Sequence, residues 1–429
     1  MALVMLVVMA LSVPLRARPA GTQAPTPVQP QVTRSGGSLV AQQVPPADPT
    51  ATPTPAPEAT PTEPQPELRE TRALWVSRWD FKDVRDVQRV VDRAAEAHFN
   101  VILFQVRGQA DAMYPSELEP WAADLTGTFG KDPGYDPLAD LIESAHARGI
   151  EVHAWMNTYP VWMGQTPPPA SASPTPMYHD FGSRYGKEWL EWKGSQPMQL
   201  GKGDYLWANP AHPAVQDRIV AVARDLLARY ELDGLHLDYI RYGDPELSLD
   251  PVSNKAYAGA AAREPGLTRE QWQRDQVTGL VQRIADEALP ERPGARLTTT
   301  AWPVYKDRWG WYKGKDGYGA MYQDSQSWAR DGRVSAIMPM LYGMTLDGHL
   351  DRYEVLANDY VTGSQPGGVV AGITAGTDDF ADIAARIEIT RKLGARGQAL
   401  FSYGALEEHN YWQALRDGPY AQPAVPNWG

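Results

Sequence analysis

The residues Asp233–Tyr242 read D-G-L-H-L-D-Y-I-R-Y and combine a short apolar strand pattern with polar groups at its C-terminal end. Side chains in a strand alternate between two faces, so His236 and Asp238 share one face while the two leucines take the other. In a strand of a parallel barrel, Asp238 would stand at the mouth, where such barrels place their chemistry. A carboxylate there can act as a nucleophile or a base. The alternative is that Asp238 only caps the next turn or pairs with Arg241.

Other polar and aromatic residues are expected at the same mouth because they end or follow other predicted strands. Aromatic rings, amides and a few charges together are typical of a carbohydrate cleft, since sugars offer C–H faces to rings and hydroxyls to planar polar groups. The residues assigned to substrate binding are Arg78, Gln105, Arg107, Tyr114, His153, Trp155, Asn157, Asn209, His236, Tyr242, Trp302, Tyr342 and Tyr403.

Hydrolysis of a glycosidic bond needs two carboxyl groups, one acting as the acid and one as the nucleophile or base. Asp238 supplies one, and no other predicted strand ends in Asp or Glu. The second must come from a loop, for which the sequence offers Asp111, Asp307, Asp378 and Asp379. We select Asp111, because it follows the second predicted strand close in sequence to Gln105 and Arg107. A general acid needs a raised pKa, which burial beneath Tyr114 or Trp121 could provide. The alternative is that Asp111 only holds Arg107 in place.

Several residues in this set have a second interpretation. His153 and His236 could hold a metal together with Asp238, but separated single histidines in a barrel more often form hydrogen bonds, and no H-E-x-x-H pattern occurs. We therefore expect no metal and no cofactor. Arg107 would either bind an anionic group of the substrate or keep Asp238 ionised. Trp155 would either line the site or belong to the core. Serine hydrolysis is unsupported, because no G-x-S-x-G motif occurs.

Strand patterns alternate with helical patterns from Glu70 onward, which indicates an α/β protein. Eight strand-then-helix units predict a (β/α)8 TIM barrel with long, aromatic-rich loops at 160–206 and 305–322. An open doubly wound sheet is the alternative, but no G-x-G-x-x-G motif follows the first strand. The predicted strands are Thr71–Ser77, Asn100–Arg107, Ile150–Tyr159, the centre of Asp233–Tyr242, Arg296–Trp302, Ala336–Tyr342, Val369–Thr374 and Gly397–Tyr403.

The composition narrows the class of partner. The 429 residues include no Cys, which excludes disulfides, thiolate metal sites and Cys nucleophiles. A net charge of −12 argues against nucleic acid or an anionic lipid surface as the partner. Together with 15 Trp and 20 Tyr, this charge suits a polysaccharide, for which aromatic faces matter more than charge.

The N-terminal part differs from the rest. Residues 1–18 are expected to be a signal peptide or an N-terminal anchor, because the apolar run Met1–Val13 is too short for a membrane span. Residues 19–68 are rich in Pro, Thr, Ala and Gln, so we expect a disordered linker. The catalytic domain is then expected at 69–418. These features predict an exported protein in the periplasm, at the cell envelope or outside the cell. If residues 1–18 are an anchor, residues 19–68 would tether the domain to a membrane; the alternative is a leader without that role.

Several motifs occur here in one order: N-V-I-L-F-Q-V-R, D-A-M-Y-P-S-E-L-E-P-W, A-H-A-R-G-I-E-V-H-A-W-M-N, N-P-A-H-P and D-G-L-H-L-D-Y-I-R-Y. Together they resemble the bacterial glycosyl-hydrolase-like 10 family from about Arg69 to Tyr403. The resemblance implies a TIM barrel of the cell envelope and cleavage of peptidoglycan glycan strands that have lost their stem peptides. The polar positions carried over by motif are Gln105, Arg107, Asp111, Tyr114, His153, Trp155, Asn157, Asn209, His236 and Asp238.

The chain departs from that family at one position. Many members have a second Asp there, and this chain has Tyr239. The same segment resembles the D-G-x-D-x-D-x-E strand of chitinases, but Ile240 stands where their acid would be, which argues against their mechanism. Two functions therefore stay open. The first is hydrolysis of cell-wall glycan, and the second is a barrel that binds glycan at the envelope without cutting it.

Overall fold

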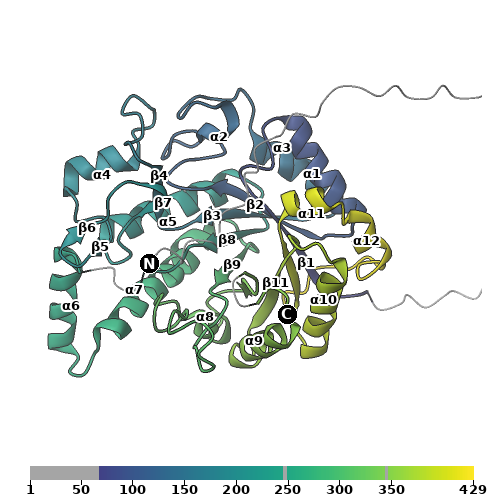
Figure 1. Cartoon of the computed structure of the whole chain (residues 1–429). Coiled ribbons are helices and arrows are strands. Elements are labelled where there is room, and N and C mark those ends of the chain that lie inside the picture. Colours follow the sequence, from purple (N-terminus) through teal and green to yellow (C-terminus); the bar gives the residue numbers. More distant parts are fainter. Residues whose placement is uncertain (1–66, 245–248, 344–345) are drawn as a thin grey trace, which may run out of the picture. The chain divides into compact units, whose positions relative to one another are not determined.

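Eight parallel strands close into a barrel in the order β1-β12-β11-β10-β9-β8-β3-β2, which confirms the predicted (β/α)8 architecture (Figure 1). The computed structural model describes residues 67–244, 249–343 and 346–429, so the expected signal segment and nearly all of the expected linker lie outside the described residues. The barrel strands are β1 Thr71–Val76, β2 Val101–Arg107, β3 Glu151–Asn157, β8 Gly234–Asp238, β9 Arg296–Ala301, β10 Ala336–Pro339, β11 Gly368–Thr374 and β12 Gly397–Phe401.

Helices surround the barrel and begin where the sequence offers capping groups. The side chain of Asp136 accepts hydrogen bonds from the backbone N–H groups of Leu138 and Ala139, and Pro137 occupies the first helical position of α3. Within the described part of the chain, no helix is long and apolar enough to cross a bilayer. The helices around the barrel are α1 Val84–Glu96, α3 Pro137–His146, α5 Pro213–Arg229, α7 Arg269–Arg283, α8 Ser325–Arg330, α9 Leu350–Gly363, α10 Phe380–Leu393, α11 Tyr403–His409 and α12 Trp412–Asp417.

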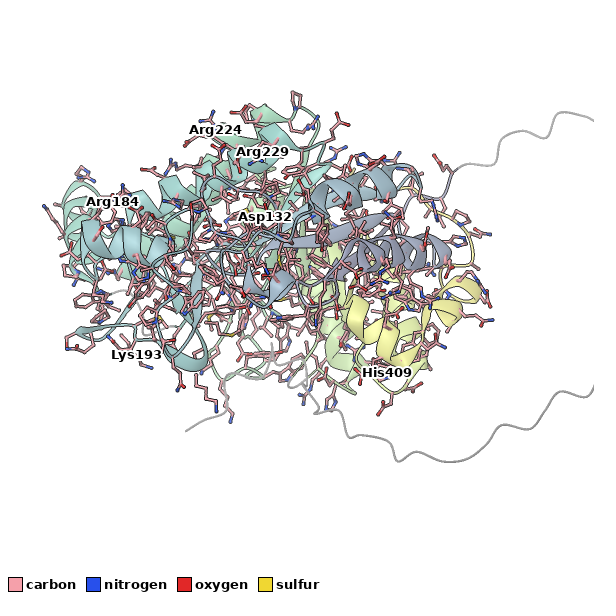
Figure 2. The ribbon with its side chains drawn as sticks, turned by 90° about the horizontal axis from the view of Figure 1, so that it is seen from above. Asp132, Arg184, Lys193, Arg224, Arg229 and His409 are labelled. Carbon is pink, nitrogen blue, oxygen red and sulfur yellow. The ribbon has the colours of Figure 1, made fainter. Side chains whose placement is uncertain are left out.

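The long excursion after β3 folds back into an antiparallel pair of strands. β4 Pro160–Gly164 pairs with β7 Gly201–Trp207, and α4 Met177–Tyr185 with the short strands β5 Trp192–Lys193 and β6 Gln196–Pro197 lies between them in sequence. Figure 2 shows Arg184 of α4 and Lys193 of β5 on one side of the molecule, away from His409 of α11. Two further helices lie in loops at α2 Ala123–Thr126 and α6 Pro251–Arg263.

The register of the strands sets the depth of each interior side chain. β3 and β8 pair His153 with Gly234, Trp155 with His236, and Asn157 with Asp238. Asp238 and Asn157 therefore lie nearest the C-terminal mouth, Trp155 and His236 one layer below, and His153 near the opposite end. Two separate apolar clusters result, one inside the barrel and one between the barrel and its helices.

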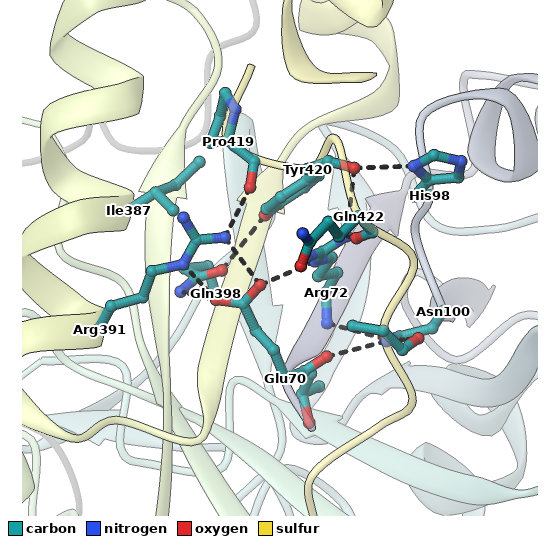
Figure 3. A network of polar contacts seen from close by, with 12 residues as sticks. Glu70, Arg72, His98, Asn100, Ile387, Arg391, Gln398, Pro419, Tyr420 and Gln422 are labelled. Atoms are coloured by element: carbon teal, nitrogen blue, oxygen red, sulfur yellow. Dashed lines mark hydrogen bonds and ion pairs between the residues drawn. The ribbon is translucent and has the colours of Figure 1, made fainter. Parts of the chain in front are cut away.

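The C-terminal segment closes the end of the barrel opposite the mouth. Glu70 is the centre of a buried network there, because its carboxylate accepts hydrogen bonds from Arg72, Arg391 and Gln398 (Figure 3). Arg72 also donates to the backbone carbonyl of Gln422 at 2.7 Å. The compact unit extends over Glu67–Gly429, so the residues after 418 belong to it as well.

Trp428 is expected to contribute strongly to the stability of the barrel. Its ring stacks on His153 at a centroid distance of 5.2 Å, and its indole N–H donates to Glu151 Oε2 at 2.8 Å. The substitution Trp428→Ala should lower the free energy of unfolding by about 3 kcal/mol, as for other buried aromatic residues. Urea denaturation would measure this loss, with the exposed Trp79→Ala as the control. Equal losses in the two variants would show that the C-terminal segment does not support the barrel.

Candidate active site

Asp238 is the last residue of β8 and lies at the mouth of the barrel, where it is 7% exposed. Its Oδ1 accepts hydrogen bonds from Thr300 Oγ1 and from the backbone N–H of Tyr239, both at 2.7 Å. Its Oδ2 accepts none from the described residues and is not sealed from solvent. Burial raises the pKa of Asp238, and these two hydrogen bonds and the charge of Arg241 partly offset that effect. The turn contact of the alternative interpretation is therefore present, but one carboxyl oxygen stays available.

Arg241 lies beside Asp238, and its guanidinium is surrounded by the rings of Trp207, Tyr239 and Trp302. We call these three rings the aromatic cage. The guanidinium carbon is 5.1 Å from the ring centres of Trp207 and Tyr239 and 4.8 Å from that of Trp302. Trp302 is fixed in turn, because its indole N–H donates to the Lys315 carbonyl at 2.7 Å. Of these three rings, the sequence placed only Trp302 in the site. The spacing of two between Tyr205 and Trp207 was a usable sign that they share one face of β7.

Arg78 follows β1 and forms the other side of the mouth. It is buried, forms an ion pair with Asp124 at 3.6 Å and donates to the Tyr205 hydroxyl at 3.3 Å. Its guanidinium also lies over the exposed ring of Trp79, at 4.8 Å. The ring of Tyr205 meets that of Tyr239 at 5.6 Å, so it links Arg78 to the aromatic cage.

Two acidic residues from the loop after β2 reach the same region. Asp111 is 1% exposed, and its carboxylate accepts hydrogen bonds from the backbone and the side chain of Gln109, both at 3.1 Å. The Asp124 side chain is 26% exposed. Burial raises the pKa of Asp124, the charge of Arg78 lowers this pKa, and the charge of Asp111 raises it. Burial also raises the pKa of Tyr205, and the charges of Asp111, Asp124 and Asp238 all act on this phenol. The carboxyl groups of Asp111, Asp124 and Asp238 therefore all lie close enough to the Tyr205 hydroxyl for their charges to act on it.

Arg107 pairs with neither Asp111 nor Asp238. The idea that Arg107 keeps Asp238 ionised is therefore wrong, and so is the idea that Asp111 holds Arg107 in place. Its guanidinium forms two hydrogen bonds with Glu119, each 2.8 Å long, and donates to the backbone carbonyls of Asn157 and Thr158. The pair is almost completely buried. Arg107 thus ties the loop after β2 to the end of β3, and its guanidinium is fully engaged there.

The two histidines lie inside the barrel below the mouth. Trp75 Nε1 can only donate, so the 3.1 Å contact makes His236 Nε2 the acceptor and leaves the proton on Nδ1, which faces Thr298 Oγ1 at 3.0 Å. Burial lowers the pKa of His236 well below its ordinary value, so the ring is neutral. His153 lies deeper still, against Trp428. Within the described ranges, no group of three His, Cys, Asp or Glu is arranged to hold a metal ion.

The other predicted binding residues divide into two groups. Trp155 lies beside the carboxyl group of Asp238 without reaching hydrogen-bond geometry, and Tyr342 feels the charge of Asp238 while its ring stacks on Phe401. The Gln105 side chain donates to Asn157 Oδ1 at 3.2 Å, in the same layer as Asp238.

A second group is held in structural positions. These residues lie outside the barrel strands, where side chains no longer alternate between two faces. Tyr114, Tyr242 and Tyr403 are buried in the larger apolar cluster, outside the barrel interior. The Asn209 side chain accepts from the backbone N–H of Ala211 at 2.9 Å, which fixes the start of α5.

None of the three other acidic candidates is held at the mouth by the contacts that the structure describes. Asp307 accepts hydrogen bonds from the backbone N–H groups of Trp311 and Tyr312, and Asp379 caps α10. Asp378 is fully exposed. Glu191, which the sequence did not suggest, is completely buried and accepts from the backbone N–H of Gly243, just beyond Arg241. Burial raises the pKa of Glu191 well above its ordinary value.

Asp80, in the loop after β1, provides a pH-dependent prediction. Burial raises its pKa to about 6, although Ser77 donates two hydrogen bonds to it. A carboxyl with a raised pKa destabilises the fold once it ionises, so this cost appears between about pH 4 and 6 and persists above. We expect Asp80→Asn to increase the free energy of unfolding at pH 7.5 by up to about 3 kcal/mol and to change it little at pH 4.

Urea denaturation at the two pH values measures this effect. Asp83 is the matched control, because a hydrogen bond from Arg85 lowers its pKa and Asp83→Asn should therefore destabilise the protein at neutral pH. A gain from Asp80→Asn that is the same at both pH values would contradict the assignment.

The comparisons with known proteins agree with this geometry. The family model described as Glycosyl hydrolase-like 10 matches residues 70–380. The chain is 28% identical to Glycosyl hydrolase DigH of Escherichia coli (strain K12) over 331 residues, covering 71% of this chain and 72% of DigH. It is 27% identical to Glycosyl hydrolase YngK of Bacillus subtilis (strain 168) over 308 residues, covering 68% of this chain and 57% of YngK. The chain thus spans little more than half of YngK.

Solved structures show the same fold. The PgaB (BpsB) glycoside hydrolase domain from Bordetella bronchiseptica superimposes with a TM-score of 0.57 at 16% identity, covering 82% of this chain and 98% of that domain. The catalytic domain of β-amylase from Paenibacillus polymyxa gives 0.53 at 10% identity, covering 80% and 97%. At such identities the likeness concerns the barrel alone.

Proposed function

The chain belongs to the glycosyl hydrolase-like 10 family, and from this membership we propose that it hydrolyses glycosidic bonds in bacterial cell-wall glycan. The proposed substrate is peptidoglycan glycan that has lost its stem peptides. The observation that carries the proposal is Asp238, a carboxylate at the mouth of the barrel with one oxygen available beside the aromatic cage. Aromatic rings at such a site suit the C–H faces of sugars.

In the proposed reaction Asp238 acts as a carboxylate, either attacking the anomeric carbon or activating a water molecule. The acid must carry a proton and reach the leaving oxygen. Asp124 suits this role better than Asp111, because its side chain is more exposed and burial raises its pKa. Asp111 then supports Asp124, since its negative charge disfavours ionisation of the neighbouring carboxyl.

The proposed location is the cell envelope, where this substrate lies. The support for it is the apolar run at Met1–Val13 followed by a proline- and threonine-rich stretch, the composition of an export signal or anchor and a spacer. A barrel that binds glycan without cutting it is the competing function, and the second carboxyl in the region of Asp238 favours hydrolysis over it.

The substrate is tested with three purified glycans: peptide-free peptidoglycan strands, intact peptidoglycan and chitin oligosaccharides. Chromatography and mass analysis of the soluble products measure cleavage. We expect fragments from the peptide-free strands at a much higher rate than from the other two. Preferential cleavage of intact peptidoglycan or of chitin would contradict the proposed substrate, and binding of the strands without any cleavage would favour the binding-only function.

Asp124→Asn separates the role of acid from a role in binding. The variant should lower turnover of natural glycan by about a hundredfold or more, the usual contribution of a general acid. A sugar substrate whose leaving group is a strongly acidic phenol needs no protonation, so its turnover should fall far less. Equal losses on both substrates would remove Asp124 from the role of acid.

A further inference from the structure

Arg241 is half-buried and lacks the direct carboxylate partner that three fully buried arginines of the barrel have. Arg72, Arg107 and Arg386 pair with Glu70, Glu119 and Asp382 at 2.8, 2.8 and 2.6 Å. Arg241 has no carboxylate within 4.0 Å among the described residues. Its charge is instead held against the faces of the aromatic cage. Cation–π contacts stabilise a guanidinium through its faces and leave its edge free for hydrogen bonds.

The edge of the Arg241 guanidinium carries hydrogen-bond donors that have no acceptor among the described residues. Nη1 donates to the Tyr242 carbonyl at 2.9 Å and touches the Met321 sulfur at 4.0 Å. Nε and Nη2 have no acceptor among the described residues, and neither atom is sealed from solvent. Since Arg241 follows Asp238 by three residues, these donors lie at the mouth of the barrel. A fixed guanidinium with two adjacent free donors matches the geometry of a carboxylate.

The negative charge around the mouth means that an acidic ligand could bind there only beside a cation such as the Arg241 guanidinium. The chain has a net charge of −12, and the negative charges of Asp111 and Asp238 both act on the Tyr205 phenol beside Arg78. Arg78 is already paired with Asp124. An acidic polymer would therefore be repelled from the mouth unless a free cation received its negative groups.

We propose that Arg241 binds a carboxylate on the glycan, so that the site selects acidic sugars over neutral ones. This inference rests on the proposed function and names the group that the site recognises. In peptidoglycan, the lactyl side chain of muramic acid ends in a free carboxylate only when no peptide is attached. Arg241 would thus recognise the loss of the peptide directly, because an amide at the same position carries no charge.

The test compares peptide-free strands with the same strands after their carboxylates have been converted to primary amides, which changes the charge but hardly the size. We expect the wild type to prefer the carboxylate form by about tenfold to a hundredfold in kcat/KM, the range for hydrogen bonds to a charged group. Arg241→Met should lose this preference by reacting more slowly with the carboxylate form only. Arg241→Lys should keep part of it. The control is Arg224→Met, which removes an arginine on α5 that forms an exposed ion pair with Glu291, and it should match the wild type.

Equal losses on both substrates in Arg241→Met would overturn the inference, because Arg241 would then act on Asp238 or on the loop. Thermal denaturation checks that each variant is folded. If no glycan is cleaved at all, the proposed function fails, but binding of the two forms of strand by wild type and Arg241→Met still decides the inference. Carboxylate-dependent binding that Arg241→Met abolishes would support it, and equal binding of both forms by the wild type would overturn it.

Discussion

Asp238→Asn should reduce turnover of peptide-free glycan by about a thousandfold and leave the affinity for glycan within about twofold. The amide has almost the same shape as the carboxylate and can still accept from Thr300 and Tyr239 through its oxygen. It can neither attack the anomeric carbon nor take a proton from water. Because this interaction exists only in the transition state, the loss should appear in kcat and not in binding.

The matched control for this experiment is Asp378→Asn, which removes a fully exposed carboxylate from the loop after β11. Initial rates and equilibrium binding are measured for both variants. Asp378→Asn should behave as the wild type. If Asp238→Asn retained most of the turnover at unchanged affinity, Asp238 would not be the catalytic carboxylate.

Glu119→Gln should destabilise the protein by about 3–5 kcal/mol, because it leaves the buried guanidinium of Arg107 without its counter-charge. The loop 108–122 should loosen first, since this pair ties it to the end of β3. Urea denaturation measures the change in the free energy of unfolding. The control is Asp92→Asn, which breaks the half-exposed pair with Arg148 and should cost less than about 1 kcal/mol.

The double variant Arg107→Met, Glu119→Leu refines the interpretation. Removing both charges together should restore much of the lost stability, because apolar side chains of similar size do not carry the desolvation cost of an unpaired charge. A Glu119→Gln variant as stable as Asp92→Asn would show that the pair is not needed to hold the loop.

The fold could be predicted because a barrel repeats a simple pattern. Every barrel strand was recognisable from its apolar run and the helix signals that follow, and the alternation of faces correctly placed Asp238, His236 and Trp155 inside. The position of an interior side chain along the barrel axis could not be predicted in the same way. It depends on the register between neighbouring strands, which is why His153 was expected at the mouth and lies at the closed end.

The partners of the charged residues were harder to predict, because they come from loops whose paths the sequence does not specify. Glu119 reaches Arg107 only after the loop following β2 folds back. The hairpin of β4 and β7 brings Trp207 next to Arg241, although the two residues lie far apart in sequence. Tyr239, the position at which the sequence departs from the motif of the family that it resembles, is part of the aromatic cage and has a positive φ of 51°.

The most direct test of the account is cleavage of peptide-free glycan strands in water enriched in heavy oxygen, followed by mass analysis of the released fragments. Hydrolysis through Asp238 places one oxygen atom from water in each product pair, so the wild type should release fragments that carry the heavy label at their new reducing ends. Asp238→Asn should release almost none. Strands that stay intact while bound to the wild type, or fragments without the label, would contradict the account.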